Sequence, residues 1–413
     1  MNQKKSRLSQ AMVFLILFGI VSLFSDMTHE GASSIRGAYL ALLGASAGAI
    51  GFISGLGELI GYSMRYLFGR ITDRTRSYWP MVILGYVLDI IAVPALALVG
   101  EHGWIAACLL LVVQRMGKAI KKPAKDTIMS FAASQEGAGR SFGLQELLDQ
   151  IGAFLGPVLL WLVMLGRTDA SPIRTYSLCF AVLAIPGGIT LLLLLYTRSR
   201  FPNPEQFEPE PKEYIPFRMK KSFILYIAGI SLFAFGFIDY SLIAMHISRT
   251  ASLSGAVGLI TEETLPLLYA GAMLIDAVSA LFFGFLYDRI GVRSLIFSTL
   301  LSSGFAVFVF SMHSVPALLV GIALWGVGMG AQESILKAAV SSMVPKSSRA
   351  TGYGIFECSF GFFWFLGSWM MGALYDFSIP AMVAVSVAAQ LLSIPLYLVS
   401  SRQKIREEQP LHE

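Results

Sequence analysis

A charged stretch between two long apolar runs, Gly69-Arg-Ile-Thr-Asp73-Arg74-Thr-Arg76-Ser-Tyr78, decides how the rest of the chain is interpreted. A second copy, Gly284-Phe-Leu-Tyr-Asp288-Arg289-Ile-Gly291-Val-Arg293, lies in the other half of the chain. The first Gly, the Asp and the following Arg of the two copies are each 215 residues apart. A motif that recurs once, at about half the chain length, indicates an internal duplication.

The composition indicates a membrane protein. Hydrophobic residues make up 55% of the 413 residues and charged residues only 14%, whereas a soluble domain usually carries about a quarter charged residues. Apolar stretches of about 20 residues recur along the chain, and each is long enough to cross the roughly 30 Å hydrocarbon core of a bilayer. The first apolar run follows basic residues but continues into Ser25-Asp26 without a small-residue cleavage site, so we expect a retained helix.

The positive charges predict the orientation of the chain. Loops assigned to the side of the termini hold 20 Lys and Arg residues. The opposite loops hold four, namely Arg36, Arg167, Arg174 and Arg249. The positive-inside rule then places both termini in the cytoplasm, and the net charge of +5 gives no reason to expect a nucleic-acid partner.

Twelve apolar segments predict an all-α membrane protein of two six-helix bundles. The expected bundles are 1–197 and 222–400, joined by a Pro-rich cytoplasmic linker, 198–221, and followed by a cytoplasmic tail, 401–413. The expected helices of the first bundle are 11–35, 45–68, 79–99, 104–130, 141–165 and 175–196. Those of the second are 223–247, 265–287, 295–312, 317–343, 352–375 and 382–399.

The duplicated turn in this layout resembles the signature of the major facilitator superfamily (MFS) of secondary transporters, over nearly the whole chain. The resemblance implies two pseudo-symmetric bundles that rock about a cleft lined by helices 1, 4, 7 and 10, in a monomer. It implies that the turns form a gating charge latch, to which we assign Gly69, Asp73, Arg74, Arg76, Glu146, Gly284, Asp288 and Arg289. Thr75 stands where the motif has a Gly, while the second copy keeps that residue as Gly291.

Two further segments are similar to a prokaryotic subgroup of unassigned substrate. They are 115–126, which begins Arg-Met-Gly-Lys, and 330–337, which begins Gly-Ala-Gln-Glu. Gly152-x-x-x-Gly156-Pro157 resembles the family's antiporter motif but lacks the Gly-Gly that follows it. The resemblance therefore implies the inner membrane of a prokaryote, with an efflux antiporter as one form of the function.

Charged residues inside apolar helices point to function, because each costs at least about 2.5–3.5 kcal/mol at the bilayer centre. Asp26, His29 and Glu30 share one face of helix 1, and Asp239 lies at nearly the repeat-equivalent place in helix 7, followed by His246. These groups are suited to taking up a proton or contacting solute, to interhelical hydrogen bonds, or to holding a divalent metal. We predict proton-coupling roles for Asp26, Glu30, Asp239 and Glu333.

Helix 4 carries a helical stripe of cations, Arg115, Lys118, Lys122 and Lys125, and helix 5 answers with Glu146 and Asp149. Two interpretations stay open: a charge network that closes the cytoplasmic side, and attraction of an anionic solute by Arg115 and Lys118. In helix 10, a local Glu333–Lys337 ion pair competes with a coupling carboxylate. The predicted solute-binding residues are His29, Arg115, Lys118, Asp149, His246, Gln332 and Glu357.

The sequence gives little support to other classes of function. There is no Walker loop, serine elbow, HExxH pair or CxxC motif, and the three cysteines lie in apolar runs, so we expect no cofactor and no enzyme. Neither linker nor tail is long enough to fold as the output domain of a sensor. The sequence predicts a secondary transporter that moves an anionic or amphiphilic organic solute coupled to protons. The alternative is a divalent-metal transporter with Asp26, His29, Glu30 and His246 as ligands.

Overall fold

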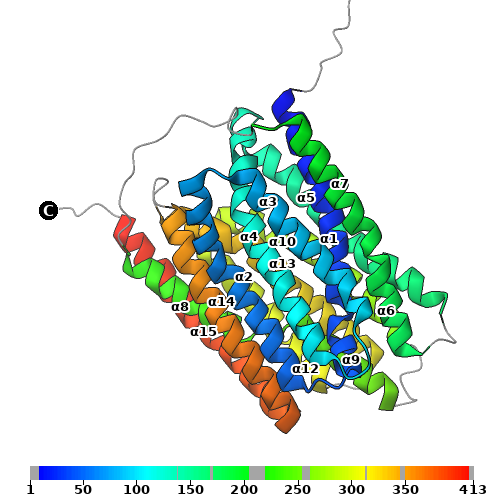
Figure 1. The fold of residues 1–413 in the computed structure, drawn as a ribbon. Helices are drawn as coiled ribbons and strands as arrows, with labels where there is room; N and C mark the ends of the chain where they lie inside the picture. Colours follow the sequence, from blue (N-terminus) through cyan, green and yellow to red (C-terminus); the bar gives the residue numbers. More distant parts are fainter. Residues whose placement is uncertain are drawn as a thin grey trace, which may run out of the picture.

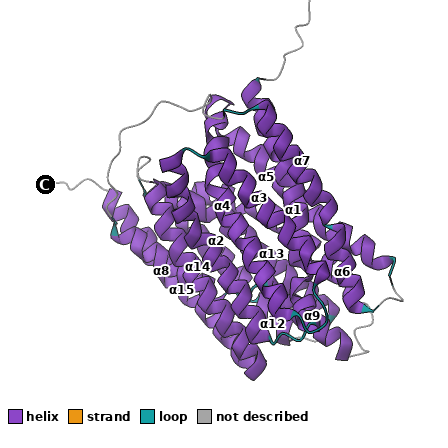
Figure 2. Cartoon of the chain, in the orientation of Figure 1, coloured by secondary structure: helices purple, strands orange, loops and turns teal. Residues whose placement is uncertain are grey.

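The computed structural model describes residues 9–136, 138–167, 171–203, 219–253, 261–311, 314–344 and 349–408. Within these ranges every regular element is a helix, and no strand occurs (Figure 2). The helices run up and down one elongated bundle, and the start of α1 lies at the same end as the finish of α15 (Figure 1). We call this the terminal end of the bundle, and the other the opposite end.

The helices fall before and after the predicted linker, of which residues 204–218 lie outside the described ranges. The N-terminal half contains α1 (Gln10–Leu42), α2 (Ala47–Thr75), α3 (Tyr78–Ala95), η1 (Leu96–Leu98), α4 (Trp104–Glu136), α5 (Ala138–Leu165), α6 (Pro172–Val182) and α7 (Ala184–Arg200). The C-terminal half contains α8 (Lys221–Gly236), α9 (Tyr240–Leu253), η3 (Glu262–Thr264), α10 (Leu265–Ile290), η4 (Gly291–Arg293), α11 (Ser294–Ser302), α12 (Phe305–Ser311), α13 (Val315–Met343), α14 (Arg349–Phe377) and α15 (Ile379–Glu408).

Eight segments of the described chain are long and apolar enough to cross a membrane. One of them, Glu262–Ser311, contains both α10 and the α11–α12 pair. Three long helices, α2, α4 and α14, are not among the eight. They carry the charged residues that make up much of the candidate site, which lowers their apolar character.

Several helix boundaries differ from those expected. The polar loop expected between helices 4 and 5 is helical on both sides of residue 137, and α15 continues as helix to Glu408, through most of the predicted tail. Helix 7 is not continuous, because α8 ends at Gly236 and α9 begins at Tyr240. Asp239 lies in this break, where its carboxylate accepts a hydrogen bond from the Ser241 backbone N–H at 2.8 Å. Such local side-chain bonds compete with helix formation.

The two halves pack mainly through α2 with α14, α1 with α9, and α5 with α10, and α1 also contacts α10. Figure 1 shows α2 and α14 side by side along much of their length. Glycine makes this approach possible, since a Cβ on Gly51 would lie 3.2 Å from the Gly372 Cα of α14. The Gly-rich start of α2 therefore serves close packing of the two helices.

Within the N-terminal half, α1 packs on α5 in the same way. A Cβ on Gly156 would lie 2.9 Å from the Gly31 nitrogen and against the Met27 backbone. The glycines that resemble an antiporter motif thus bring two helix backbones together at the level of the buried charges. Cys108 and Cys179 are buried free thiols, as expected, while Cys358 is half-buried.

Candidate functional site

Ionisable side chains gather near the middle of the bundle. Asp26 lies at the midpoint of α1, and Lys118 and Asp149 lie close to the midpoints of α4 and α5. The charged groups that act on the Asp26 carboxyl are Asp149, Lys118, Lys125 and Glu30. Neither Asp26 nor Lys118 has a hydrogen bond or ion pair with another side chain in the described part of the chain. Two opposite charges therefore stand near each other, each with its bonding capacity free.

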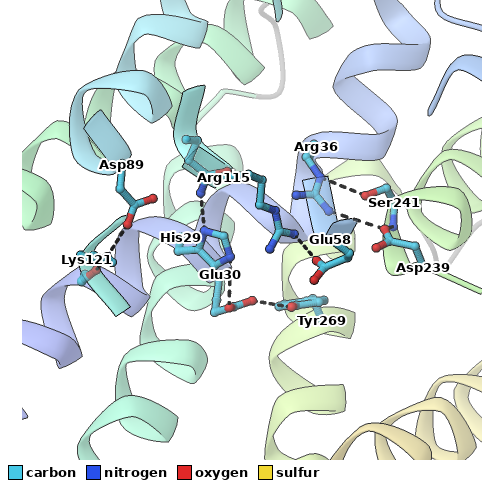
Figure 3. A network of polar contacts seen from close by, with 12 residues as sticks. His29, Glu30, Arg36, Glu58, Asp89, Arg115, Lys121, Asp239, Ser241 and Tyr269 are labelled. Atoms are coloured by element: carbon cyan, nitrogen blue, oxygen red, sulfur yellow. Dashed lines mark hydrogen bonds and ion pairs between the residues drawn. The ribbon is translucent and has the colours of Figure 1, made fainter. Parts of the chain in front are cut away.

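The cations beside Lys118 are held by acids from neighbouring helices. The Arg115 Nη2 atom lies 2.7 Å from the carboxylate of Glu58 on α2. Lys121 donates to Asp89 of α3 and to Ser25 of α1, and its ammonium lies 3.9 Å from the centre of the Tyr86 ring. Figure 3 shows both pairs in one network around α1. Since buried charges are costly unless paired, these bonds keep two cations stable in the bundle.

His29 and Glu30 continue the network across the interface. The Gln114 amide bonds to Nδ1 of His29, whose Nε2 lies 3.6 Å from the Glu30 carboxylate. The other Glu30 oxygen accepts a 2.6 Å hydrogen bond from the Tyr269 hydroxyl of α10 (Figure 3). Glu30 thus joins the N-terminal half to the C-terminal half, while Asp26, one turn away, joins nothing.

Arg36 and Asp239 form a second bridge between the halves, nearer the opposite end. The guanidinium lies 3.5 Å from Asp239 Oδ1, and its Nε donates to the Ser241 hydroxyl at 3.0 Å. This corrects one expectation, since Arg36 is not a loop residue but is 7% exposed within α1. Asp239, at nearly the repeat-equivalent place of Asp26, pairs with Arg36. The sequence predicts a loop at Arg36 because the first apolar run stops at residue 35. No helix-ending residue follows there, and the helix continues through Arg36.

The paired cations of the α4 stripe have separate bonding partners. Lys122 pairs with Asp126 on its own helix at 3.1 Å, and Lys125 donates to Ser22 of α1. On helix 5, Asp149 accepts a hydrogen bond from Gln145 at 2.7 Å, and Glu146 accepts one from Gln150 at 3.3 Å. The structure therefore does not join the stripe to α5 by direct ion pairs among described residues.

The residues predicted on helices 10 and 11 lie apart from Asp26. Gln332 is buried and Glu333 is exposed on α13, while the side chain of Lys337 lies outside the described part. Glu357 of α14 lies 3.3 Å from Arg65 of α2, and so links the two halves toward the terminal end. Of the aromatic side chains of helix 11, Phe360 and Trp364 are buried, whereas Phe362 and Phe363 are exposed, as lipid-facing side chains would be.

Each of the duplicated turns ends a helix at a residue with positive φ. Arg74 and Arg76 follow Gly69 on α2, Asp288 and Arg289 follow Gly284 on α10, and these four charged side chains are exposed, while the side chain of Asp73 is outside the described part. Arg76 has φ 50° and Gly291 has φ 62°. The offset of 215 pairs these two positions, so Arg76, and not Thr75, stands where the motif has its Gly. The latch role of these residues stays a prediction.

The alternative metal ligands are not brought together. His246 lies on α9, where its Nδ1 is 2.9 Å from the Tyr375 hydroxyl and its ring packs on Phe310. No group of three His, Cys, Asp or Glu residues in the described ranges is arranged to hold a metal ion. The geometry gives no support to a site made of Asp26, His29, Glu30 and His246.

Several residues of the network were not predicted from sequence, among them Tyr269, Gln114 and Arg36. Tyr269 and Gln114 are common residues in apolar helices, and only their contacts with Glu30 and His29 single them out. No spacing rule relates Glu30 to Tyr269, which lies 239 residues away. Only the fold brings them together.

An all-helical bundle with ionisable groups at its centre is the architecture of a membrane transporter. The chain belongs to the Major Facilitator Superfamily, whose family model matches residues 8–261 and 239–413. It is therefore a multi-pass secondary transporter and not an enzyme, as the sequence predicted.

Relatives in sequence carry no assigned substrate. An uncharacterized protein of Mycobacterium tuberculosis is 36% identical over 387 residues, which cover 92% of this chain and 91% of the relative. An uncharacterized MFS-type transporter of Methanocaldococcus jannaschii is 28% identical over 375 residues, with 88% of each chain covered.

Solved transporter structures share the fold. A nucleoside transporter superposes with a TM-score of 0.72 at 14% identity, over 96% of this chain and 100% of that chain. A D-xylose-proton symporter gives 0.68 at 13% identity, over 93% and 96%. A peptide transporter crystallised with sulfate gives 0.72 at 14% identity, over 95% and 94%. These likenesses concern the fold alone.

Proposed function

We propose that the protein moves a small anionic organic solute across the cytoplasmic membrane by alternating access, coupled to protons. In this proposal Lys118 binds the anionic group of the solute, and Asp26 carries the proton. Arg115 helps to attract the solute but stays paired with Glu58. Two of the other predicted coupling residues, Glu30 and Asp239, act through the bridges they form between the halves.

The observation that carries the proposal is the pair of unsatisfied charges at the centre. Asp26 and Lys118 lie near the midpoints of α1 and α4, and neither has a hydrogen bond or ion pair with another described residue. Charges at this depth are costly and are retained where they line a pathway or bind. An ammonium has three donors and no acceptor, so an anion satisfies it.

The closeness of the two groups supplies the coupling. An ionised Asp26 competes with an anionic solute for the positive charge of Lys118, whereas a protonated Asp26 does not. The proton and the anion then bind together, by linkage, and solute affinity rises as pH falls. This favours movement of both in one direction over the exchange suggested by the helix 5 motif, whose Gly156 is explained by packing on α1.

We further propose twelve crossings in two six-helix bundles, with both termini in the cytoplasm and a monomer as the working unit. The eight apolar segments include one that holds two successive helices, and α2, α4 and α14 have the length of further crossings. Similar packing in the two halves supports the duplication, since α2 packs on α4 as α10 packs on α13, and α1 on α7 as α8 on α15.

A thermal-shift screen of the purified protein tests the proposal. Organic anions, organic cations, sugars and divalent metals are each added at about pH 5.5 and 7.5, because a ligand stabilises by RT ln(1 + [L]/Kd). We expect an anion to raise the melting temperature more at the lower pH. Asp26→Asn should keep the shift and lose its pH dependence, and Lys118→Met should lose the shift.

The matched control is Lys122→Met, since Lys122 is partly exposed and paired within α4, and it should behave as wild type. A shift caused only by a divalent metal, or an anion shift that survives in Lys118→Met, contradicts the proposal.

A further inference from the structure

A third carboxyl group lies near a helix midpoint, on the other half of the chain. Asp276 is close to the middle of α10 and is 2% exposed. Its Oδ2 accepts one long hydrogen bond, 3.4 Å, from the Gln150 amide nitrogen of α5. Its Oδ1 is buried without a hydrogen-bond partner. Gly330 of α13 leaves room for that oxygen, since a Cβ there would lie 2.7 Å from it.

Among the described side chains, the charges with the largest effect on Asp276 are acids. They are Glu333 of α13, Glu146 of α5 and Glu30 of α1. No Lys or Arg of the described chain forms an ion pair with it. A buried carboxylate without a cation is strongly disfavoured, and neighbouring acids disfavour it further, so such a group takes up a proton.

Gln150 provides an independent sign of that proton. Its Oε1 is also buried without a hydrogen-bond partner. When Asp276 is ionised, its Oδ1 and the Gln150 Oε1 are both acceptors, and neither can satisfy the other. A proton on Asp276 turns the carboxyl into a donor as well as an acceptor. The acid and the amide can then exchange two hydrogen bonds, and both orphaned atoms are accounted for.

We infer that Asp276 is a second proton-binding residue, carried by the C-terminal half, and that its proton holds α10 against α5 through Gln150. With the proton, the two halves share a reciprocal acid–amide pair. Without it, one long hydrogen bond remains beside an unpaired negative charge that faces Glu333. Loss of the proton therefore weakens the contact between α5 and α10. The link to transport rests on the proposed function, whereas the presence of the proton does not.

Infrared spectroscopy of the full chain in lipid nanodiscs tests the proton directly, with no need for a known solute. A protonated carboxyl has a C=O stretch distinct from that of a carboxylate. At neutral pH we expect the wild type to show this acid band and Asp276→Asn to lose part of its intensity. Asp126→Asn removes an exposed aspartate of α4 and should leave the band unchanged.

Two further variants separate a proton from a merely structural role. Asp276→Glu should keep an acid band at a shifted frequency. Gln150→Leu should keep the band intensity but move its position, because the acid loses its amide partner. If the spectra of Asp276→Asn and the wild type agree across neutral and alkaline pH, Asp276 is ionised and the inference is wrong.

The contact itself is tested by distances between spin labels on Leu147 of α5 and Leu281 of α10, both exposed. The three native cysteines are first replaced. We expect the distance to increase with pH in the wild type. It should stay short at all pH values in Asp276→Asn, since an amide–amide pair mimics the protonated acid. A pH-independent wild type would overturn the role of the proton in the contact. These results can hold even if the thermal-shift screen finds no solute. Equally, the screen can succeed even if these results contradict the inference about Asp276.

Discussion

The Arg36 guanidinium of α1 lies 3.5 Å from the Asp239 carboxylate, in the break between α8 and α9. Both side chains are buried, and Arg36 also donates to Ser241. Because the two residues come from different halves, this pair bridges the halves near the opposite end of the bundle. Alternating access requires that such a bridge break when that end opens.

The pair should behave as a unit. Arg36→Met or Asp239→Leu alone leaves one buried charge without its partner, a change that typically costs about 3–5 kcal/mol. The double variant removes both charges and should cost much less than the sum. Melting temperatures of the purified variants measure this. If the effect of the double variant equals the sum of the two single effects, the pair is not coupled.

A carboxylate of α14 caps the first turn of α2. Asp376 accepts hydrogen bonds from the Ala47 and Gly48 backbone N–H groups at 3.3 and 2.8 Å. Removing a cap of this kind costs about 0.5–2 kcal/mol. We therefore expect Asp376→Ala to lower the melting temperature of the purified protein. The control is Asp126→Ala, which removes an exposed acid of α4. Equal melting temperatures for the two variants would argue against the capping role of Asp376.

Close packing of α5 on α1 depends on Gly156. Gly156→Ala places a Cβ 2.9 Å from the Gly31 nitrogen and against the Met27 backbone, so one helix must shift. Overpacking typically costs about 1–3 kcal/mol. The comparison is Gly188→Ala on α7, where the added Cβ would have no neighbouring atom within 4 Å. We expect a lower melting temperature for Gly156→Ala only, and equal values for both variants would contradict the packing account.

The ends of α2 and α10 differ in the residue that takes positive φ. Gly291 has φ 62° and ψ −143°, a region that other residues rarely adopt, so Gly291→Ala should cost about 1–3 kcal/mol. Gly271→Ala should be neutral or stabilising by up to about 1 kcal/mol, because Gly271 lies inside α10 and its added Cβ would meet open space. Urea or thermal unfolding of the two variants in detergent gives the comparison, and a tolerated Gly291→Ala would refute the strain argument.

The apolar pattern was enough to predict most of the helices. Apolar runs of membrane-spanning length predicted α1, α2, α13 and their neighbours, and their ends were wrong mainly because helices continue into charged turns, as α2 does to Thr75. The break before Tyr240 was missed because its cause is a local bond from Ser241 to Asp239. Periodicity carries no sign of such a bond.

The candidate site was predictable in its members and not in its pairs. Buried charges stand out in an apolar chain, so Asp26, Glu30, Arg115 and Lys118 were all identified. Which of them are paired depends on helices far apart in sequence, as with Arg115 and Glu58. The sequence therefore could not show that Asp26 and Lys118 are the two left without partners.

Proton-driven transport in proteoliposomes tests the central claim, that Asp26 couples the proton to a solute held by Lys118. The solute is the anion identified by thermal shift, and its accumulation is measured with and without an inward proton gradient. We predict gradient-driven accumulation by the wild type, none by Lys118→Met, and solute exchange without gradient-driven accumulation by Asp26→Asn. Undiminished gradient-driven accumulation by Asp26→Asn would contradict the account.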